Sequence, residues 1–415
     1  MAEPLGRGRA IGVFLAFAAA YFLSALLRAV TATLAPTLSA ELALQASDLG
    51  LLAGGYFLGF SAMQLPLGRW LDRHGPKRVV LLFLSVAVAG CAAFAWADHF
   101  YGLLAARVLT GAGVSACLMA PLTGYRRWLH PDMQLRANAW MLMVGALGMV
   151  AATLPVQWLV PLVGWRGVFW VLAAAIVAAA AWIAWAAPGW SQGSGEHGTC
   201  MAGSDHLPDA GGYAQVLRHP YFRRMAGIGL VNYGGMVAIQ TLWAGPWLVQ
   251  VAGHSAAQAA QGLFWINVCM LGMFWVWGWV TPTLARRGLR VEQLIAWGLP
   301  GSFLALGALL WQGPQTGWGH WALFCLASTV GSLAQPAVAQ AFPAAMAGRA
   351  LSAYNLLIFS GVFAVQWGIG LAVDAFVGLG WSVVAAFRGA VGGYLAACVL
   401  CYGYFLVAKA HNRRP

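Results

Sequence analysis

The sequence has 415 residues, of which 61% are apolar and only 8% are charged. Because soluble domains carry roughly 25% charged residues, a water-soluble protein of this size is excluded. A transmembrane β-barrel is excluded too, since its strands alternate apolar and polar residues over about ten positions. The net charge of +12 does not indicate a nucleic-acid partner, because the basic residues gather in short segments between apolar runs, as in cytoplasmic loops of membrane proteins.

Twelve apolar runs follow one another along the chain, and many are long enough, at roughly 20 residues, to cross a bilayer as helices. The first run follows a basic N-terminal segment and extends for about 25 residues, which is too long for the core of a signal peptide. We therefore predict an all-α membrane protein with a retained first helix. The predicted spans are 11–35, 47–67, 79–97, 100–122, 137–161, 167–187, 224–251, 258–282, 291–311, 319–342, 350–376 and 381–408.

The longest polar stretch divides these spans into two groups of six. It is rich in Gly, Ser, His and Asp, which is typical of a flexible linker. The predicted organisation is an N-terminal bundle (1–187), a cytoplasmic linker (188–222) and a C-terminal bundle (223–415). All but four of the 23 basic residues fall on one side of the membrane if the N-terminus is cytoplasmic. The positive-inside rule therefore predicts two cytoplasmic termini, and the short loops and high Ala, Gly and Arg content indicate a bacterial cytoplasmic membrane.

A charged hairpin, GRWLDRHGPKR at 68–78, joins the second and third predicted spans. Gly68 is expected to allow close approach of a neighbouring helix, and Gly75 suits a tight turn with a positive φ. Asp72 lies at the end of the second span, where it can interact with a helix N-terminus and nearby Arg groups. The hairpin thus carries more chemistry than a short connection needs.

This hairpin matches, in spacing and in its place between spans, the G-x-x-x-D-R-x-G-x-[RK]-[RK] signature of the major facilitator superfamily. A second segment, RVLTGAG at 107–113, is similar to the family's motif of an Arg followed by a glycine pair. GWVTPTLARRGLR at 278–290 repeats the hairpin in degenerate form, with Gly288 aligned to Gly75 but without the acid. The chain resembles this family in topology over essentially its whole length. The matching hairpin residues are Gly68, Leu71, Asp72, Arg73, Gly75, Lys77 and Arg78.

The resemblance implies two pseudo-symmetric six-helix bundles that move a small molecule by alternating access. It also implies that the hairpin is a gating latch, which holds the bundles together on the cytoplasmic side when the binding site faces outward. The partner of Asp72 would then be the start of the eleventh span, near Arg349. The alternative is a charged turn that only fixes orientation. Because Arg and Lys alone would do that, the acid and the two glycines favour the latch.

The predicted spans contain buried arginines but no buried acid, since all eleven acids and all nine histidines fall in loops, in tails or near span ends. Arg28 lies seven residues before the predicted end of span one, and Arg107 seven residues after the predicted start of span four. Both are therefore about 10 Å deep at 1.5 Å per residue. Two guanidinium groups without a carboxylate favour an anionic substrate. The stretch LLRAVTATLAP at 26–36 is also similar to the first span of organic-anion and organophosphate members of the family.

Each candidate substrate contact has a second interpretation. Arg107 belongs to a motif common across the family, so a structural or coupling role is equally open. Arg28 could extend to the outer interface, because long basic side chains snorkel. In the second bundle Gln240, Trp243 and Gln335 are further candidates for substrate binding, although an intramembrane Gln often only bridges helices.

These features predict a secondary active transporter for a small organic anion, coupled to a proton or to a counter-anion, that acts as a monomer in the lipid bilayer. The alternatives are a multidrug or apolar-compound efflux transporter, which the Trp-rich second bundle would suit, and a transporter-like membrane sensor. An enzyme is not predicted, because no nucleophile–base pair or metal cluster lies at depth. No cofactor is predicted, and no G-x-x-x-x-G-K-[ST] loop indicates direct drive by ATP.

Overall fold

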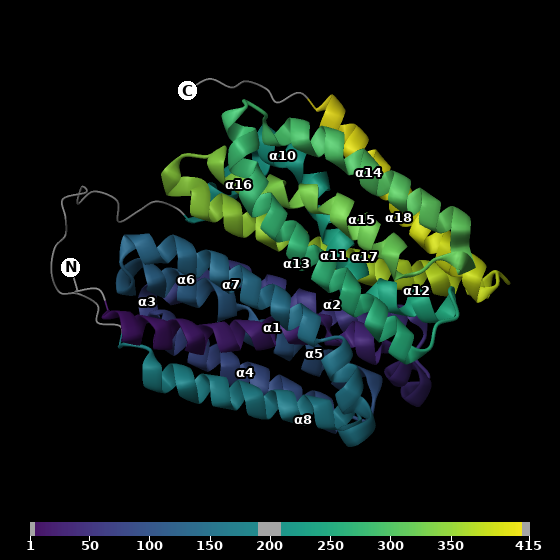
Figure 1. Cartoon of the computed structure of the whole chain (residues 1–415), viewed down its shortest axis with the longest axis horizontal. Coiled ribbons are helices and arrows are strands. Elements are labelled where there is room, and N and C mark those ends of the chain that lie inside the picture. Colours follow the sequence, from purple (N-terminus) through teal and green to yellow (C-terminus); the bar gives the residue numbers. More distant parts are fainter. Residues whose placement is uncertain (1–4, 190–208, 409–415) are drawn as a thin grey trace.

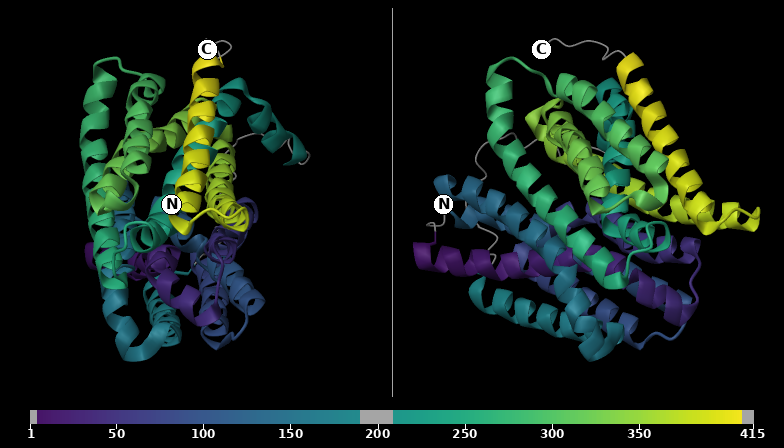
Figure 2. Two further views of the ribbon diagram at one scale, coloured as in Figure 1. Left: turned by 90° about the vertical axis from the view of Figure 1, so that its right-hand side faces the viewer. Right: turned by 45° about the vertical axis from the view of Figure 1, so that its right-hand side comes forward.

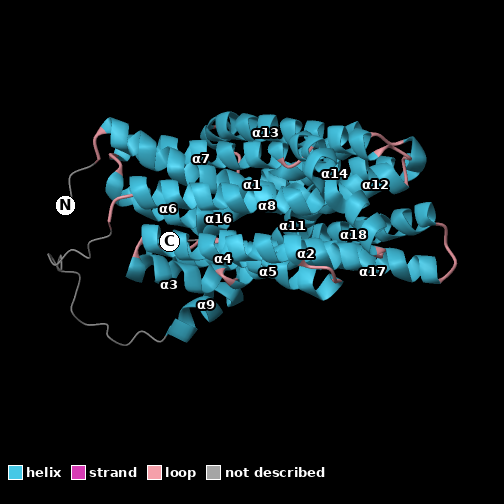
Figure 3. Cartoon of the chain, turned by 90° about the horizontal axis from the view of Figure 1, so that it is seen from below, coloured by secondary structure: helices cyan, strands magenta, loops and turns pink. Residues whose placement is uncertain are grey.

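The computed structural model describes residues 5–189 and 209–408, and every regular element in these ranges is a helix (Figure 1, Figure 3). Before the linker lie α1 (Arg7–Leu42), α2 (Ala46–Ala62), α3 (Gln64–His74), α4 (Pro76–Trp96), α5 (Phe100–Val114), α6 (Ala116–Trp128), α7 (Pro131–Ala151) and α8 (Leu154–Ala186). After it lie α9 (Asp209–Arg218), α10 (Pro220–Gly227), η1 (Ile228–Tyr233), α11 (Gly234–Ala238), η2 (Ile239–Trp243), α12 (Ala244–Gln250), α13 (Ala256–Arg286), α14 (Val291–Gln312), η3 (Gly313–Gln315), α15 (Trp318–Ser328), η4 (Thr329–Leu333), α16 (Ala334–Gln340), α17 (Ala344–Gly378) and α18 (Val383–Val407). The expected all-α membrane protein is confirmed.

The predicted spans correspond to these helices with few changes. Ten helices in the described part of the chain are long and apolar enough to cross a membrane, and residues 136–151 of α7 form a shorter apolar helix. The predicted spans 47–67 and 137–161 are also helical but interrupted, the first at Met63 and the second at Thr153. The helices are therefore consistent with twelve spans arranged as six and six.

The first helix is longer than predicted, because Pro36 does not end it. Proline has no N–H, so the carbonyl of Ala32 loses its donor within α1, yet the helix continues to Leu42. Gly245 of α12 packs against this carbonyl, and a Cβ on that glycine would lie 2.9 Å from the Ala32 oxygen. The proline position is thus a site of close contact between the two halves of the chain.

The fifth and sixth spans are divided differently from the prediction. α7 ends at Ala151, and the carbonyl of Ala152 in the break accepts a hydrogen bond from the Thr33 hydroxyl of α1 at 2.7 Å. The chain then continues as α8 through a turn at Gly164, whose φ of 68° explains the choice of glycine. The neighbouring helix α1 therefore satisfies a backbone carbonyl that the break leaves without a helical donor.

The linker is partly helical, whereas the sequence predicted a flexible segment over 188–222. Residues 209–218 form α9, and Val216 of this helix is fully buried in a cluster with Phe222 and Phe342. An apolar side chain that can be buried favours helix formation in an otherwise polar segment. Residues 190–208 of the predicted linker lie outside the described residues.

The two groups of helices meet at one end of the molecule. We call it the far end, where α17 is joined to α18 and α8 turns. The opposite end, where α1 begins, α18 ends and α3 is joined to α4, is called the termini end. The bundles lie side by side at the far end and spread apart toward the termini end (Figure 1, Figure 2). Contact between α2 and α17 is close, because a Cβ on Gly50 would lie 2.4 Å from the Gln366 carbonyl oxygen.

Candidate functional site

Arg28 lies on α1 where the two bundles face each other. Its guanidinium carbon is 5.6 Å from the ring centre of Phe60 on α2 and 5.7 Å from that of Phe359 on α17. The side chain is half-buried, and its Nε is buried without a hydrogen-bond partner among the described residues. Because α1 continues to Leu42, Arg28 lies fourteen residues from the helix end, or about 21 Å. It therefore lies well inside α1, away from both helix ends, and between the bundles.

Aromatic side chains surround this arginine. Tyr21, Tyr56 and Tyr233 lie within electrostatic range of its guanidinium group, and the hydroxyl of Tyr56 donates a hydrogen bond to the Ser24 carbonyl at 3.0 Å. Ring faces attract a cation without neutralising it. No described carboxylate forms an ion pair with Arg28, so the positive charge remains available for an anion. Sequence reasoning missed this aromatic shell, because spacing alone does not distinguish it from ordinary packing.

Arg107 is located behind this shell and is fully buried on α5. One terminal nitrogen, Nη1, donates to the carbonyl of Leu27 at 3.2 Å, and the guanidinium carbon lies 5.2 Å from the ring centre of Tyr56. Its Nε and Nη2 have no hydrogen-bond partner within the described ranges. The two arginines thus come together around Tyr56, but only Arg28 has an exposed part that a substrate could reach. Arg107 holds the α1 backbone one residue before Arg28.

The glycine pair after Arg107 has a packing role. A Cβ on Gly111 would lie 1.9 Å from the carbonyl oxygen of Tyr56 on α2, and one on Gly113 would lie 2.3 Å from the backbone nitrogen of Ala87 on α4. No side chain fits at either distance, so the glycines let α5 contact both neighbouring helices through its backbone.

The three polar candidates of the second bundle contact neighbouring helices. The Gln240 amide donates to Asn267 on α13 at 3.0 Å, and the Trp243 indole donates to the Gln366 carbonyl on α17 at 3.0 Å. Gln335 is hydrogen-bonded to Asn355 on α17. All three bonds join helices within the second bundle, which is the bridging role that the sequence left open for the glutamines.

Of the two predictions made for the hairpin glycines, the structure agrees with the one at Gly75 and not with the one at Gly68. Gly75 has a φ of 76°, and Gly288, its counterpart in the second half, also has a φ of 76°. The predicted positive φ and the internal repeat are therefore confirmed at these turns. The close helix approach expected at Gly68 is wrong, because a Cβ there would meet nothing within 4 Å. Gly68 is instead exposed on the surface of α3.

The charged hairpin residues are distributed over different surroundings. Asp72 is exposed and makes no hydrogen bond or ion pair with another described residue. Lys77 donates to the Ala187 carbonyl at 2.7 Å, which joins the start of α4 to the end of α8 within the first bundle. Arg73 and Arg78 are exposed.

An acid joins the two bundles at the far end. The carboxylate of Asp374, near the end of α17, accepts hydrogen bonds from the backbone N–H of Ala46 at 3.1 Å and of Ser47 at 2.7 Å. These N–H groups begin α2 and have no acceptor within that helix. A carboxylate at a helix N-terminus is also stabilised by the helix dipole. The sequence placed Asp374 near a span end but gave no sign of its partner.

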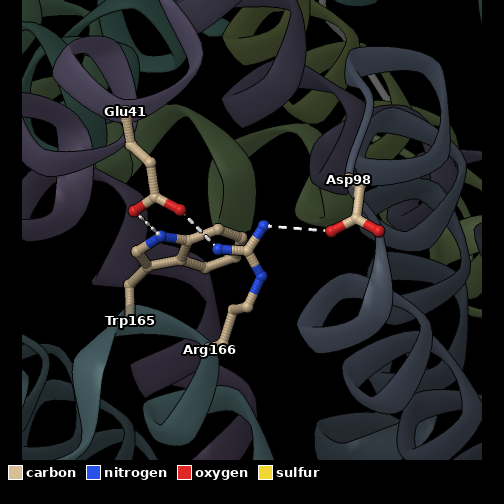
Figure 4. A network of polar contacts seen from close by, with 4 residues as sticks. All are labelled: Glu41, Asp98, Trp165 and Arg166. Carbon is tan, nitrogen blue, oxygen red and sulfur yellow. Dashed lines mark hydrogen bonds and ion pairs between the residues drawn. The ribbon is translucent and has the colours of Figure 1, made fainter.

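A second polar network at the far end lies entirely within the first bundle (Figure 4). Arg166 of α8 forms ion pairs with Glu41 at the end of α1 and, at 3.3 Å, with Asp98 before α5. The indole of Trp165 donates to the same Glu41 carboxylate at 2.6 Å, and the Arg166 guanidinium lies 4.1 Å from its ring centre. The network fastens three helix ends of one bundle together.

Two bundles of membrane-length helices that meet around a guanidinium group, with no carboxylate partner among the described residues, are the arrangement expected of a membrane transport protein. The chain belongs to the Major Facilitator Superfamily, whose family model matches residues 17–366. The resemblance seen in the hairpin is thereby confirmed, and the protein is a transporter and not an enzyme. Within the described residues, no group of three His, Cys, Asp or Glu could hold a metal ion.

Known relatives are similar over most of the chain. It is 24% identical over 382 residues to the inner membrane transport protein YajR of Escherichia coli strain K12, covering 88% of this chain and 76% of YajR. It is 24% identical over 302 residues to a galacturonate transporter of Dickeya chrysanthemi, covering 70% of this chain and 86% of that protein. The fold matches the crystal structure of a bacterial homologue of the human lysosomal transporter Spinster, inward-facing and unoccupied, with a TM-score of 0.80 and 18% identity over 98% of both chains.

Proposed function

We propose that this protein is a secondary active transporter for a small organic anion with a carboxylate group. The observation that carries the proposal is Arg28, a half-buried guanidinium group at the meeting of both bundles with no carboxylate partner among the described residues. A charge at this depth is costly, so it is expected to have a function. The planar fork of Arg pairs with a carboxylate through two parallel hydrogen bonds. Arg107 adds a second positive charge and positions α1, without a surface for the substrate.

The surroundings of Arg28 suit a substrate that also has an apolar face. Phe60 and Phe359 approach from opposite bundles, and their rings can pack against the C–H groups of a sugar or an organic acid. Galacturonate, which is named for one relative, combines a carboxylate with a sugar ring. This relative therefore supports the proposed class of substrate. Because each bundle supplies one ring, a bound substrate would contact both halves of the protein.

We infer that the structure has its binding site open toward the cytoplasm. The bundles are in contact at the far end and apart at the termini end, and the basic residues of the termini end mark the cytoplasmic side. Both termini and the linker would then be cytoplasmic, in the cytoplasmic membrane of a bacterium. Transport by alternating access would require the contacts at the far end to open and those at the termini end to close.

Substrate transport is expected to be coupled to a second ion without the help of a buried acid. Among the described residues, no carboxylate pairs with the guanidinium group of Arg28 or of Arg107, so no acid in this part of the chain is in position to exchange a proton with the site. We propose exchange for a second anion, or protons that enter with the substrate. Gln240, Trp243 and Gln335 would then support the second bundle through their interhelical bonds.

The proposal is tested by flux into liposomes that contain the purified protein. Radiolabelled galacturonate and other small carboxylates are expected to enter, with faster entry when a second anion is loaded inside or when the outer pH is lowered. Organic cations and neutral sugars of the same size are the controls. Transport of cations in place of carboxylates would overturn the anion assignment.

The latch proposed for the hairpin makes a separate prediction. α3 lies against α17, and rocking of the bundles would bring Asp72 to the N-terminus of α17 at Ala344, where an anion is stabilised. Asp72→Asn is therefore expected to leave binding affinity unchanged and to slow transport about fivefold, for a loss near 1 kcal/mol. Equilibrium binding and flux on the same preparation measure the two quantities. Asp98→Asn, at the far end and within one bundle, is the matched control, and equal flux in both variants would count against the latch.

The contact at the far end predicts a change in the population of conformations in which that end is open. Asp374→Asn removes the charge that joins α17 to the N-terminus of α2 and is expected to weaken the closed far end by about 1 kcal/mol. Spin labels are attached at His99 and Leu379, which are exposed on different bundles. In Asp374→Asn, a larger fraction of molecules than in the wild type should have a long distance between the two labels. Asp98→Asn again serves as the control. An unchanged distance distribution would show that other contacts keep the far end closed.

A further inference from the structure

Arg388 is a charged residue within a membrane helix that the transport site does not use. It lies on α18, five residues after the helix begins at Val383, which places it about 7.5 Å along the helix. Its side chain is exposed. The same two helices carry exposed apolar side chains, Leu304 and Trp311 of α14 and Leu400 of α18, which the bilayer is expected to cover.

The position along the helices corresponds to the headgroup region of the membrane. Trp311, near the end of α14, is 82% exposed, and Trp381, just before α18, is 47% exposed. Indole rings concentrate at this level of a bilayer. Arg388 is therefore located where the phosphates of the lipid leaflet at the far end come within reach.

The arginine is held in place beside an open groove. Its Nε donates to the Leu310 carbonyl at 3.0 Å, one of the last carbonyls of α14, which lack helical donors. No other hydrogen bond joins Arg388 to a described residue, so its two terminal nitrogens keep four N–H donors. The groove has a volume of about 320 Å³ and is lined by Leu310, Trp381, Ala385, Arg388 and Gly389.

Apart from Arg388, the groove is lined by apolar side chains and a glycine. Trp381 stacks on Phe376 with ring centres 4.6 Å apart. A Cβ on Gly389 would lie 3.0 Å from both rings, so the glycine brings α18 against this pair. A fixed guanidinium group at the deeper end of this groove, at headgroup depth, matches a phosphodiester whose acyl chains continue inward along the two helices.

We propose that this groove binds the headgroup of a phospholipid of the leaflet at the far end, with the lipid phosphate on Arg388, the headgroup toward Trp381 and Ala385, and the acyl chains deeper in the bilayer along α14 and α18. The site is separate from the transport site and does not depend on the function proposed above. Loss of the charge is expected to weaken lipid binding about tenfold, as for a charge-assisted hydrogen-bonded pair.

The test places a cysteine in the groove and measures its alkylation in delipidated, detergent-solubilised protein. In Ala385→Cys, added dioctanoyl-phosphatidylglycerol should slow alkylation of the new thiol about tenfold. Peptide mass spectrometry also measures the alkylation rate of Cys401, a half-buried residue farther along α18. The lipid should not change this second rate. Dioctanoylglycerol, which lacks the phosphate, and inorganic phosphate alone should not protect.

Variants at Arg388 in this background complete the experiment. Arg388→Gln should abolish the protection, Arg388→Lys should retain part of it, and Arg223→Gln, which removes an exposed charge at the termini end, should retain all of it. Equal protection with and without Arg388, or protection by dioctanoylglycerol, would overturn the proposal. Protection by inorganic phosphate would show a free-anion site in place of a lipid site. If Arg388→Gln does not fold, the proposal is still tested by comparing dioctanoyl-phosphatidylglycerol with dioctanoylglycerol on the protein that retains Arg388.

Discussion

Arg28→Gln is expected to reduce the affinity for the transported anion at least about 100-fold, which corresponds to ~3 kcal/mol. Glutamine keeps a polar group on a shorter side chain but removes the charge and the bidentate fork that pairs with a carboxylate. Nothing else described can replace it, because Arg107 is fully buried and its Nη1 is used by the Leu27 carbonyl. Substrate-dependent thermal stabilisation and flux into liposomes measure the loss in binding and in transport.

Two companion variants separate charge from geometry at this site. Arg28→Lys retains the charge without the fork and is expected to recover part of the affinity, whereas a residue that only packed against Phe60 and Phe359 would not show this order. Arg223→Gln removes an exposed charge away from the bundle interface and should behave as the wild type. Anion transport that survives Arg28→Gln unchanged would contradict the proposed site.

Gly111→Ala is expected to destabilise the first bundle by about 3 kcal/mol or more, although it adds a single methyl group. The new Cβ would lie 1.9 Å from the Tyr56 carbonyl oxygen, and because the contact is with backbone, α2 and α5 must separate. Tyr56 packs against both arginines, so the site would be displaced as well. The melting temperature in detergent should fall by about 5 °C or more, with reduced recovery of monodisperse protein.

The control for this prediction is the same change in open space. Gly12→Ala in α1 would meet nothing within 4 Å, and alanine is the better helix former by up to about 1 kcal/mol. Its melting temperature should therefore equal or exceed that of the wild type. Similar behaviour of the two variants would indicate that α2 and α5 can separate without cost.

The sequence was sufficient for the class of protein and for most of its helices. Hydrophobic runs of bilayer length predict spans because unpaired backbone groups are excluded from lipid, and this holds whatever the neighbours are. The turn at Gly75 and its repeat at Gly288 were predictable for a similar reason: a positive φ is a local property that selects glycine. The charged hairpin and the helical architecture therefore followed from the order of residues alone.

Only the tertiary structure distinguished the two arginines. Both are single charges in apolar helices, yet Arg28 lies between the bundles and Arg107 is buried within one of them. Lipid is as apolar as the protein interior, so hydropathy does not reveal which face of a membrane helix meets lipid, a neighbouring helix or a substrate. The same limit explains why Pro36 did not end α1, why Gln240 bridges helices and why Gly68 faces open space. These outcomes depend on how helices distant in sequence pack together, which local composition does not encode.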